Sequence, residues 1–250
     1  MSGVMKISWL AIVMLVMVIP HSSRAMPNAT NRVAPDGMTA YLAGDYLKAA
    51  ELFQKSVQAQ PSTGAWLNLG LAEWQRNLAG PAVLAWERAL WVDPYNAEAR
   101  GNLQFARKTA QLESPEYAWH EAASMWLPVN AWPILAGVSL WFAVAMITLP
   151  RVLRWQRGNW QQGLAATGCA IFLLCLPSLY GVHTRTKIGI VQQKDTELRL
   201  TPTREGQTVM QMPAGQPVRW ERQRGEYFFV RTRYGKGWVE RSKLGLVCPN

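Results

Sequence analysis

Two apolar runs constrain this chain most. The first covers Ala131–Leu149 and the second Gly163–Val182, and neither contains a charged residue. Each has about the 20 residues that a helix needs to cross a bilayer. A helix buried in a soluble core is the alternative, but two runs without a polar face argue against it. The sequence therefore predicts transmembrane helices over residues 129–149 and 161–182.

The loop between the two runs predicts their orientation. It spans residues 150–160 and carries three arginines and no acid: Arg151, Arg154 and Arg157. Loops rich in Lys and Arg lie on the cytoplasmic side of a membrane, so we expect this loop to be cytoplasmic. The approach to the first run carries three acids instead: Glu113, Glu116 and Glu121. Two basic residues follow the second run, so the asymmetry is real but incomplete.

An apolar stretch near the N-terminus has the features of an export signal. Ile7–Pro20 follows Lys6 and spans about 14 residues, too few to cross a bilayer as a helix. Ser23 and Ala25 supply small residues at the positions that a signal peptidase reads. We therefore predict a signal peptide over residues 1–25, with a retained short anchor as the alternative. Together with the cytoplasmic loop, this predicts a multi-pass protein of the bacterial inner membrane whose soluble parts both lie in the periplasm.

The region before the spans contains a pattern that recurs after 33 residues. It pairs small, aromatic and proline positions: Ala49 with Ala82, Phe53 with Trp86, Ser56 with Ala89, and Pro61 with Pro94. Small and aromatic residues at this spacing form one helix face that a neighbouring helix can approach closely, and the proline ends the helix. In period and pattern the region 33–112 resembles the tetratricopeptide repeat. Pro35 predicts that the first helix starts late.

The resemblance to tetratricopeptide repeats implies a concave groove that holds a peptide. Asn68 and Asn102 occupy the same place in successive repeats, 34 residues apart, and can each bond a peptide backbone or carboxylate. Leu67, Leu71 and Trp74 are the apolar candidates beside them. The alternative is that asparagine is simply common at this position.

Short strand candidates replace the helical period after residue 187. Turn residues separate them, as in Pro213-Ala214-Gly215 and Gly235-Lys236-Gly237, and this spacing is typical of a small barrel. Leu198–Pro202, Met212–Val218 and Gly225–Val239 resemble successive parts of a bacterial SH3-type domain over residues 187–247.

Such domains bind peptides or cell-wall peptide stems, so aromatic and basic side chains here are candidate groove residues. They are Trp220, Tyr227, Tyr234, Trp238, Arg231 and Arg233. Packing in the core is the alternative for each aromatic, and for Trp238 it is the favoured one. The expected fold is thus multidomain, with an all-α tetratricopeptide repeat, two transmembrane helices and a C-terminal all-β SH3-like barrel.

The charge of the chain is concentrated in this last region. The whole chain has a net charge of +10. Residues 184–250 carry 13 Lys or Arg against 6 Asp or Glu, whereas residues 26–128 carry 8 against 10. A basic region favours anionic partners such as lipid headgroups, cell-wall polymers or acidic proteins. A solvated basic surface beside a membrane is the equally open alternative.

Few residues are placed for catalysis. His21, His120 and His183 are isolated, and no nucleophile elbow, phosphate-binding loop or metal-binding spacing occurs. Cys169 and Cys175 lie inside an apolar run and form no redox or metal motif. We therefore expect no enzyme activity, no cofactor, no metal and no nucleic-acid partner.

The order of a signal, helical repeats, two spans with a basic loop and a terminal SH3-type domain resembles the BatE proteins of bacterial aerotolerance operons. That resemblance implies von Willebrand-type membrane proteins and, indirectly, a MoxR-class ATPase as partners. It predicts an envelope scaffold for protein–protein interaction. A peptidoglycan binder or wall sensor is the main alternative, and a hydrophobic subunit of a larger membrane enzyme is a third.

Overall fold

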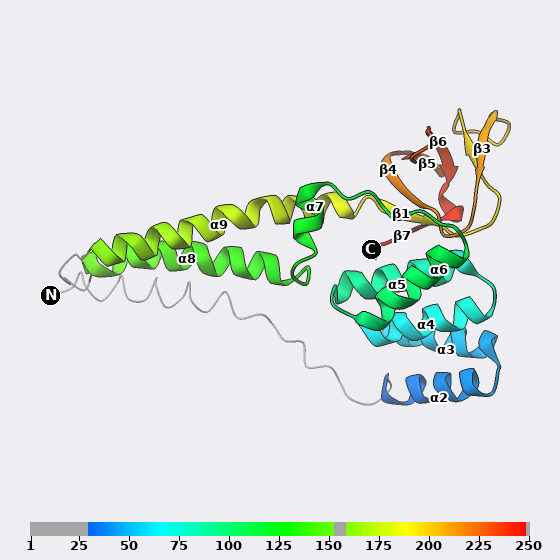
Figure 1. Cartoon of the computed structure of the whole chain (residues 1–250), viewed down its shortest axis with the longest axis horizontal. Helices are drawn as coiled ribbons and strands as arrows, with labels where there is room; N and C mark the ends of the chain where they lie inside the picture. The colour runs from blue at the N-terminus through cyan, green and yellow to red at the C-terminus, as the bar shows by residue number, and fades with distance from the viewer. Residues whose placement is uncertain (1–29, 153–158, 249–250) are drawn as a thin grey trace.

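The computed structural model describes residues 30–152 and 159–248, so the expected signal peptide and two of the loop arginines, Arg154 and Arg157, lie outside the described residues. The described helices are α2 (Thr30–Leu42), α3 (Tyr46–Ala59), α4 (Thr63–Gln75), α5 (Ala79–Val92), α6 (Ala97–Thr109), α7 (Trp119–Ser124), α8 (Ala131–Val152) and α9 (Asn159–Arg185). The strands are β1 (Ile188–Val191), β2 (Thr196–Arg199), β3 (Thr208–Met212), β4 (Pro217–Arg224), β5 (Tyr227–Arg231), β6 (Lys236–Glu240) and β7 (Leu244–Leu246). Helices, two of them long and apolar, are thus followed by a C-terminal antiparallel sheet, as expected (Figure 1).

Helices α2 to α6 form a helical array in which consecutive helices pack on one another. Asp45, Ser62 and Asn96 begin α3, α4 and α6 by accepting a hydrogen bond from the backbone N–H three residues later, which satisfies one of the free donors of the first turn. Helix α2 continues through Pro35, so the late start predicted from that proline is wrong.

The 33-residue period seen in the sequence is present in the packing of the array. A side chain at Gly37 would lie 2.7 Å from the ring of Phe53, and one at Gly70 would lie 2.4 Å from the ring of Trp86. The glycine lets the aromatic ring of the following helix pack directly on the backbone. Both pairs recur with the same spacing, so α2–α3 and α4–α5 are equivalent helix pairs.

Helices α8 and α9 form an antiparallel hairpin that extends away from the rest of the molecule (Figure 1). Small residues face one another between the two helices: a side chain at Gly168 would lie 3.0 Å from the Ser139 carbonyl oxygen and 3.1 Å from Ala143 Cβ. Close approach through small residues is typical of helix pairs in membranes. Both helices are long and apolar enough to cross a membrane.

The short helix α7 crosses the end of α9 where the hairpin meets the array and the sheet (Figure 1). A side chain at Gly181 of α9 would lie 2.1 Å from the His120 carbonyl oxygen, so only glycine allows this contact. Trp132 of α8 is buried, and its indole N–H donates to the Ser124 carbonyl oxygen at 2.9 Å. These contacts fix the hairpin to α7.

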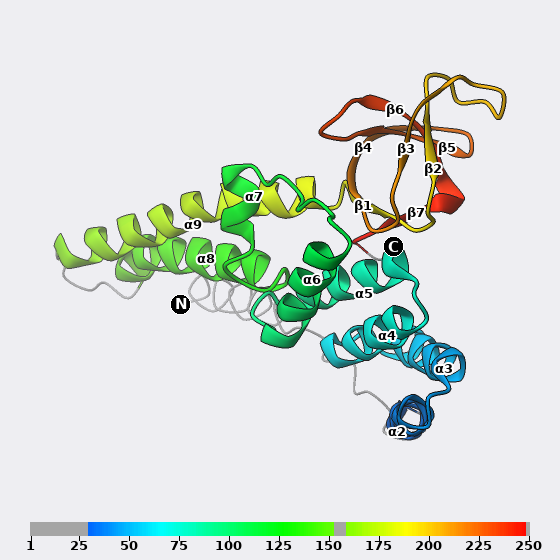
Figure 2. The same ribbon diagram turned by 45° about the vertical axis from the view of Figure 1, so that its right-hand side comes forward.

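The seven strands form one antiparallel sheet in the order β3-β2-β6-β5-β4-β1-β7. Figure 2 shows the strands curving around one another. The register shifts between Trp220 and Arg222, where β4 pairs with β5. Apolar side chains from several strands form the interior of the sheet: Val191, Leu198, Met212, Val218, Phe228, Val230, Val239 and Leu244.

The helical array and the sheet share a hydrophobic core. Ile188 and Ile190 of β1 and Val247 belong to the same buried cluster as the array. A side chain at Gly80 of α5 would lie 2.4 Å from the Gln192 carbonyl oxygen, so the backbones nearly touch. Arg88 of α5 donates two hydrogen bonds to the Leu246 carbonyl oxygen, at 3.1 and 2.8 Å. The array and the sheet therefore form one packed unit, called the head below.

Candidate functional site

The candidate site lies where an extended segment crosses the sheet. This segment, residues 113–118, connects α6 to α7 and is called the linker below. The chain enters it through Leu112, which is buried against the turn before β4; Gly215 in this turn has a φ of 91°, and a side chain there would lie 2.5 Å from Leu112. Glycine adopts such positive φ values without strain. A glutamate side chain fastens the chain to the sheet at each end of the linker.

Glu113 makes the first of these contacts. Its carboxylate accepts hydrogen bonds from the Gln216 amide at 3.0 Å and the Tyr234 hydroxyl at 2.9 Å, and it pairs with Arg233 at 3.5 Å. The Glu113 side chain is 22% exposed and the Arg233 side chain is 67% exposed. The contact is therefore polar and close to solvent.

Glu121, at the start of α7, makes the second contact, which is buried. Its carboxylate receives two bonds from the Arg219 guanidinium, at 2.6 and 2.8 Å, and one from the Ala118 backbone N–H at 2.9 Å. The Glu121 side chain is only 1% exposed. Burial alone raises the pKa of this carboxyl, but the bonds from Arg219, Ala118 and Thr184 outweigh it and hold the pKa at about 2.

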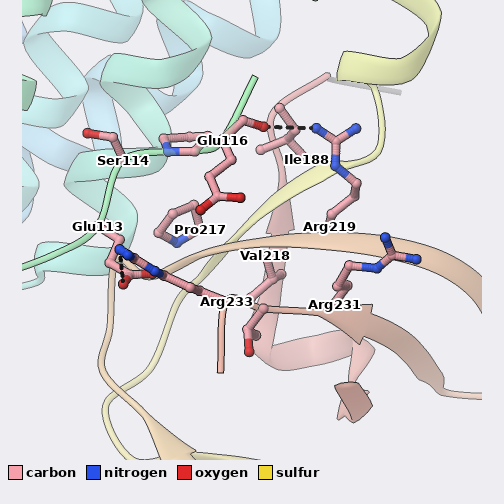
Figure 3. Close-up of a pocket in the computed structure, with 11 residues that line it drawn as sticks. Glu113, Ser114, Glu116, Ile188, Pro217, Val218, Arg219, Arg231 and Arg233 are labelled. Carbon is pink, nitrogen blue, oxygen red and sulfur yellow. Dashed lines mark hydrogen bonds and ion pairs between the residues drawn. The ribbon is translucent and has the colours of Figure 1, made fainter. Parts of the chain in front are cut away.

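A pocket of about 110 Å³ lies between the linker and strands β1, β4 and β5 (Figure 3). Ile188, Pro217 and Val218 give it an apolar side. Arginines from β4, β5 and the turn after β5 give it a basic side: Arg219, Arg231 and Arg233. The pocket combines an apolar wall with guanidinium groups, a combination suited to a chain that carries a carboxylate.

A second, more open hollow of about 430 Å³ adjoins this pocket. Glu116, Arg219 and Arg231 line both. Together they form a groove that follows the linker toward α7. Arg219 is held there by Glu121 and also donates to the Glu116 carbonyl oxygen at 3.2 Å (Figure 3).

Two of the groove residues predicted from the sequence, Arg231 and Arg233, line this pocket, and Tyr234 bonds the linker beside it. The remaining three aromatics lie elsewhere. Trp238 is buried and packs on Phe229 with ring centroids 5.2 Å apart, as the packing alternative expects. Trp220 packs against the interior of the sheet, and Tyr227 is half-buried on β5.

The residues predicted for the repeat groove lie on α4 and α6. Leu67 is buried in the core of the array, and Leu71 is half-buried against it. Trp74 lies between Trp86 and the exposed Phe105 of α6, with ring centroids 5.9 Å from each.

Asn68 and Asn102 are half-buried, and their side chains have no hydrogen-bond partner among the residues that the structure describes. Arg151, the described arginine of the predicted loop, is exposed at the end of α8 farthest from the head (Figure 1).

A buried cationic residue joins the hairpin to the head and was not predicted. Arg185, at the end of α9, stacks on the ring of Trp91 of α5 at 4.9 Å and donates to the Ser124 hydroxyl at 3.3 Å. Its neighbour in the same region is a buried ion pair between Glu87 of α5 and Arg107 of α6. A charged side chain is stable in the protein interior only when it is paired with an opposite charge or hydrogen-bonded.

Among the described residues, no group of three or more His, Cys, Asp or Glu side chains is arranged to hold a metal ion. The sequence matches no protein-family model and no curated protein. The function proposed for this chain therefore rests on its geometry.

Proposed function

We propose that this chain is an envelope scaffold anchored in the bacterial inner membrane, whose head binds partner proteins. The observation that carries the proposal is a hairpin with an apolar outer surface attached firmly to a head that contains a groove. Leu173 and Leu174 of α9, for example, are well exposed, and lipid chains accommodate such side chains without cost. Arg185 attaches the hairpin directly to the head through Trp91, and Gly181 and Trp132 attach it to α7.

The aromatic residues near the junction support this position in the membrane. Trp119, Trp126 and Tyr180 are exposed around the end of the hairpin that carries the head. Trp and Tyr are enriched at the membrane–water interface. Arg151 lies at the other end, so the positive-inside rule favours a cytoplasmic loop and a periplasmic head.

The proposal includes the nature of the two parts of the head. The recurring Gly37–Phe53 and Gly70–Trp86 packing supports tetratricopeptide-type helix pairs. The antiparallel order of short, curved strands around one apolar interior supports an SH3-like barrel. In this interpretation the protein is of the BatE type, and von Willebrand-type membrane proteins and, indirectly, a MoxR-class ATPase are its partners.

Cysteine labelling tests the orientation. In a chain whose three native cysteines are replaced by serine, Asn159→Cys reports on the loop side and Ser242→Cys on the head, because both positions are exposed. A membrane-impermeant maleimide added to intact spheroplasts is expected to label the head cysteine and not the loop cysteine. The reverse pattern contradicts the proposed topology.

Partner capture tests the scaffold. Photocrosslinking in the native envelope from positions beside Asn68 or Asn102 is expected to yield a discrete partner protein that mass spectrometry identifies. A second crosslinking position on the hairpin serves as the control for proximity within the bilayer. Capture of lipids or of random abundant proteins alone contradicts the scaffold.

A second function, binding to peptidoglycan, is favoured by the exposed basic end of the β4–β5 hairpin, which includes Arg222 and Arg224. Sedimentation of the detergent-solubilised full chain with purified cell wall tests it. Retention that survives high salt supports the wall binder, because attraction between exposed charges is screened at high ionic strength. Loss of retention in high salt favours the scaffold.

A further inference from the structure

We propose that the groove between the linker and strands β4 and β5 binds an acidic, extended segment of a partner protein, and that Glu113 occupies one end of this site in cis. The inference depends on the proposed function in one respect: both assume that the ligand is part of a partner protein. Arg231 and Arg233 are the residues that hold the carboxylates of the partner.

The contacts of Glu113 show that the sheet is built to hold a carboxylate. Three donors converge on it from two separate turns: Gln216 precedes β4, and Arg233 and Tyr234 follow β5. Hydrogen bonds between ionised groups are stronger than neutral ones. The chemistry of this end of the site is therefore recognition of an acidic side chain on an extended backbone, which the linker itself supplies.

The contact between Glu113 and Arg233 can be replaced by a contact between Arg233 and a carboxylate of the partner. Both Glu113 and Arg233 reach solvent, and ion pairs of that kind contribute little to stability. Glu121, in contrast, is buried against Arg219 and fixes the other end of the linker. The segment between them can therefore release Glu113 without losing its attachment to the head.

The shape of the groove favours a chain over a compact anion. The smaller pocket has an apolar wall formed by Ile188, Pro217 and Val218, and it opens past Arg231 into the larger hollow. An extended peptide can place an apolar side chain on this wall and carboxylates at both ends. A small anion such as phosphate would not contact the apolar wall and would not span the length of the groove.

Arg231 supplies the second cationic group. Within the described chain its guanidinium is paired with Glu221, and the Arg231 side chain is 53% exposed. A guanidinium has five N–H donors, so one such pair leaves several donors for a ligand. Figure 3 shows Arg219 and Arg231 on one side of the pocket and Arg233 against Glu113 on the other.

Fluorescence anisotropy tests the site with the full chain in detergent and a labelled peptide that copies residues 111–118, Gln-Leu-Glu-Ser-Pro-Glu-Tyr-Ala. We expect saturable binding that the Arg231→Gln/Arg233→Gln variant weakens about tenfold or more, since charge-assisted bonds are lost. The matched control is Arg204→Gln/Arg241→Gln, which removes the same charge from exposed positions outside the groove. An equal loss in the control overturns the proposal.

The cis contact has its own test. Glu113→Gln removes the internal competitor, so we expect it to tighten binding of the peptide several-fold, whereas a peptide with both glutamates changed to glutamine is expected not to bind. Weaker or unchanged binding to Glu113→Gln contradicts the shared site. These two measurements decide the matter even where the arginine variant folds poorly.

Failure of the inference can be told from failure of the scaffold. If the envelope crosslink to a partner persists in the Arg231→Gln/Arg233→Gln variant and the peptide does not bind, the scaffold stands and this groove is not its binding site. If no partner is captured by either chain while the peptide binds specifically, the groove stands and the scaffold falls.

Discussion

The buried pair between Glu121 and Arg219 gives the sharpest prediction for stability. Glu121→Gln keeps the shape of the protonated side chain and removes the charge that Arg219 neutralises. Each tenfold change in an ionisation constant corresponds to about 1.4 kcal/mol. The fall of the Glu121 pKa from 4.5 to about 2 therefore assigns roughly 3 kcal/mol of stability to its ionised form.

The sign of the pH dependence follows from this shift. A carboxyl whose pKa is lowered in the folded state contributes fully above its ordinary pKa of 4.5, and its contribution is lost as the pH falls toward 2. The difference between the wild-type chain and Glu121→Gln is thus expected to be roughly 3 kcal/mol at pH 7 and about 1.4 kcal/mol at pH 3.

Urea unfolding of the detergent-solubilised chain, followed by tryptophan fluorescence, measures this difference. Glu221→Gln is the matched control, because it also breaks a carboxylate–arginine pair of the sheet, but a partly exposed one, and we expect it to cost about 0–1 kcal/mol. Equal losses for the two variants, or a Glu121→Gln loss that does not change between pH 7 and pH 3, refute the reasoning.

Two further predictions concern glycines at close contacts. Gly80→Ala drives a Cβ into the backbone at Gln192 and is expected to destabilise the head by about 1–3 kcal/mol in the same unfolding assay; Gly101→Ala, which meets nothing within 4 Å, is expected to cost nothing, and equal effects contradict a shared core. Gly168→Leu is expected to widen the α8–α9 spacing measured by electron paramagnetic resonance, whereas Gly163→Leu, with open space around it, leaves the spacing unchanged; an unaltered spacing in both contradicts the packing of the hairpin.

The helices and strands could be predicted because their signals are local. Uncharged runs long enough to span a membrane, the period of 33 residues and the turn residues between short strands all lie within one or two elements. The start of α2 could not be predicted from Pro35, because the proline lies inside the helix and the residues from Thr30 up to it already have helical backbone.

The groove could be predicted only in part. Arg231, Arg233 and Tyr234 stood out as basic and aromatic residues near turns, but their neighbours come from the linker, about 100 residues away in the sequence. In the sequence, Glu113 and Glu121 stood out only as acidic residues before the first apolar run. They were used there to predict the orientation of the chain in the membrane. Their partners on the sheet depend on tertiary packing, which no local pattern encodes.

The shared core of the array and the sheet has a consequence for how the chain is made. Synthesis runs from the N-terminus, so α5 is complete before α8, α9 and the strands that cover it have left the ribosome. Until β1 and β7 arrive, the apolar surface around Val83 and Leu84 remains open to chaperones and proteases. A chain whose synthesis stalls within the hairpin therefore leaves this apolar surface of α5 uncovered.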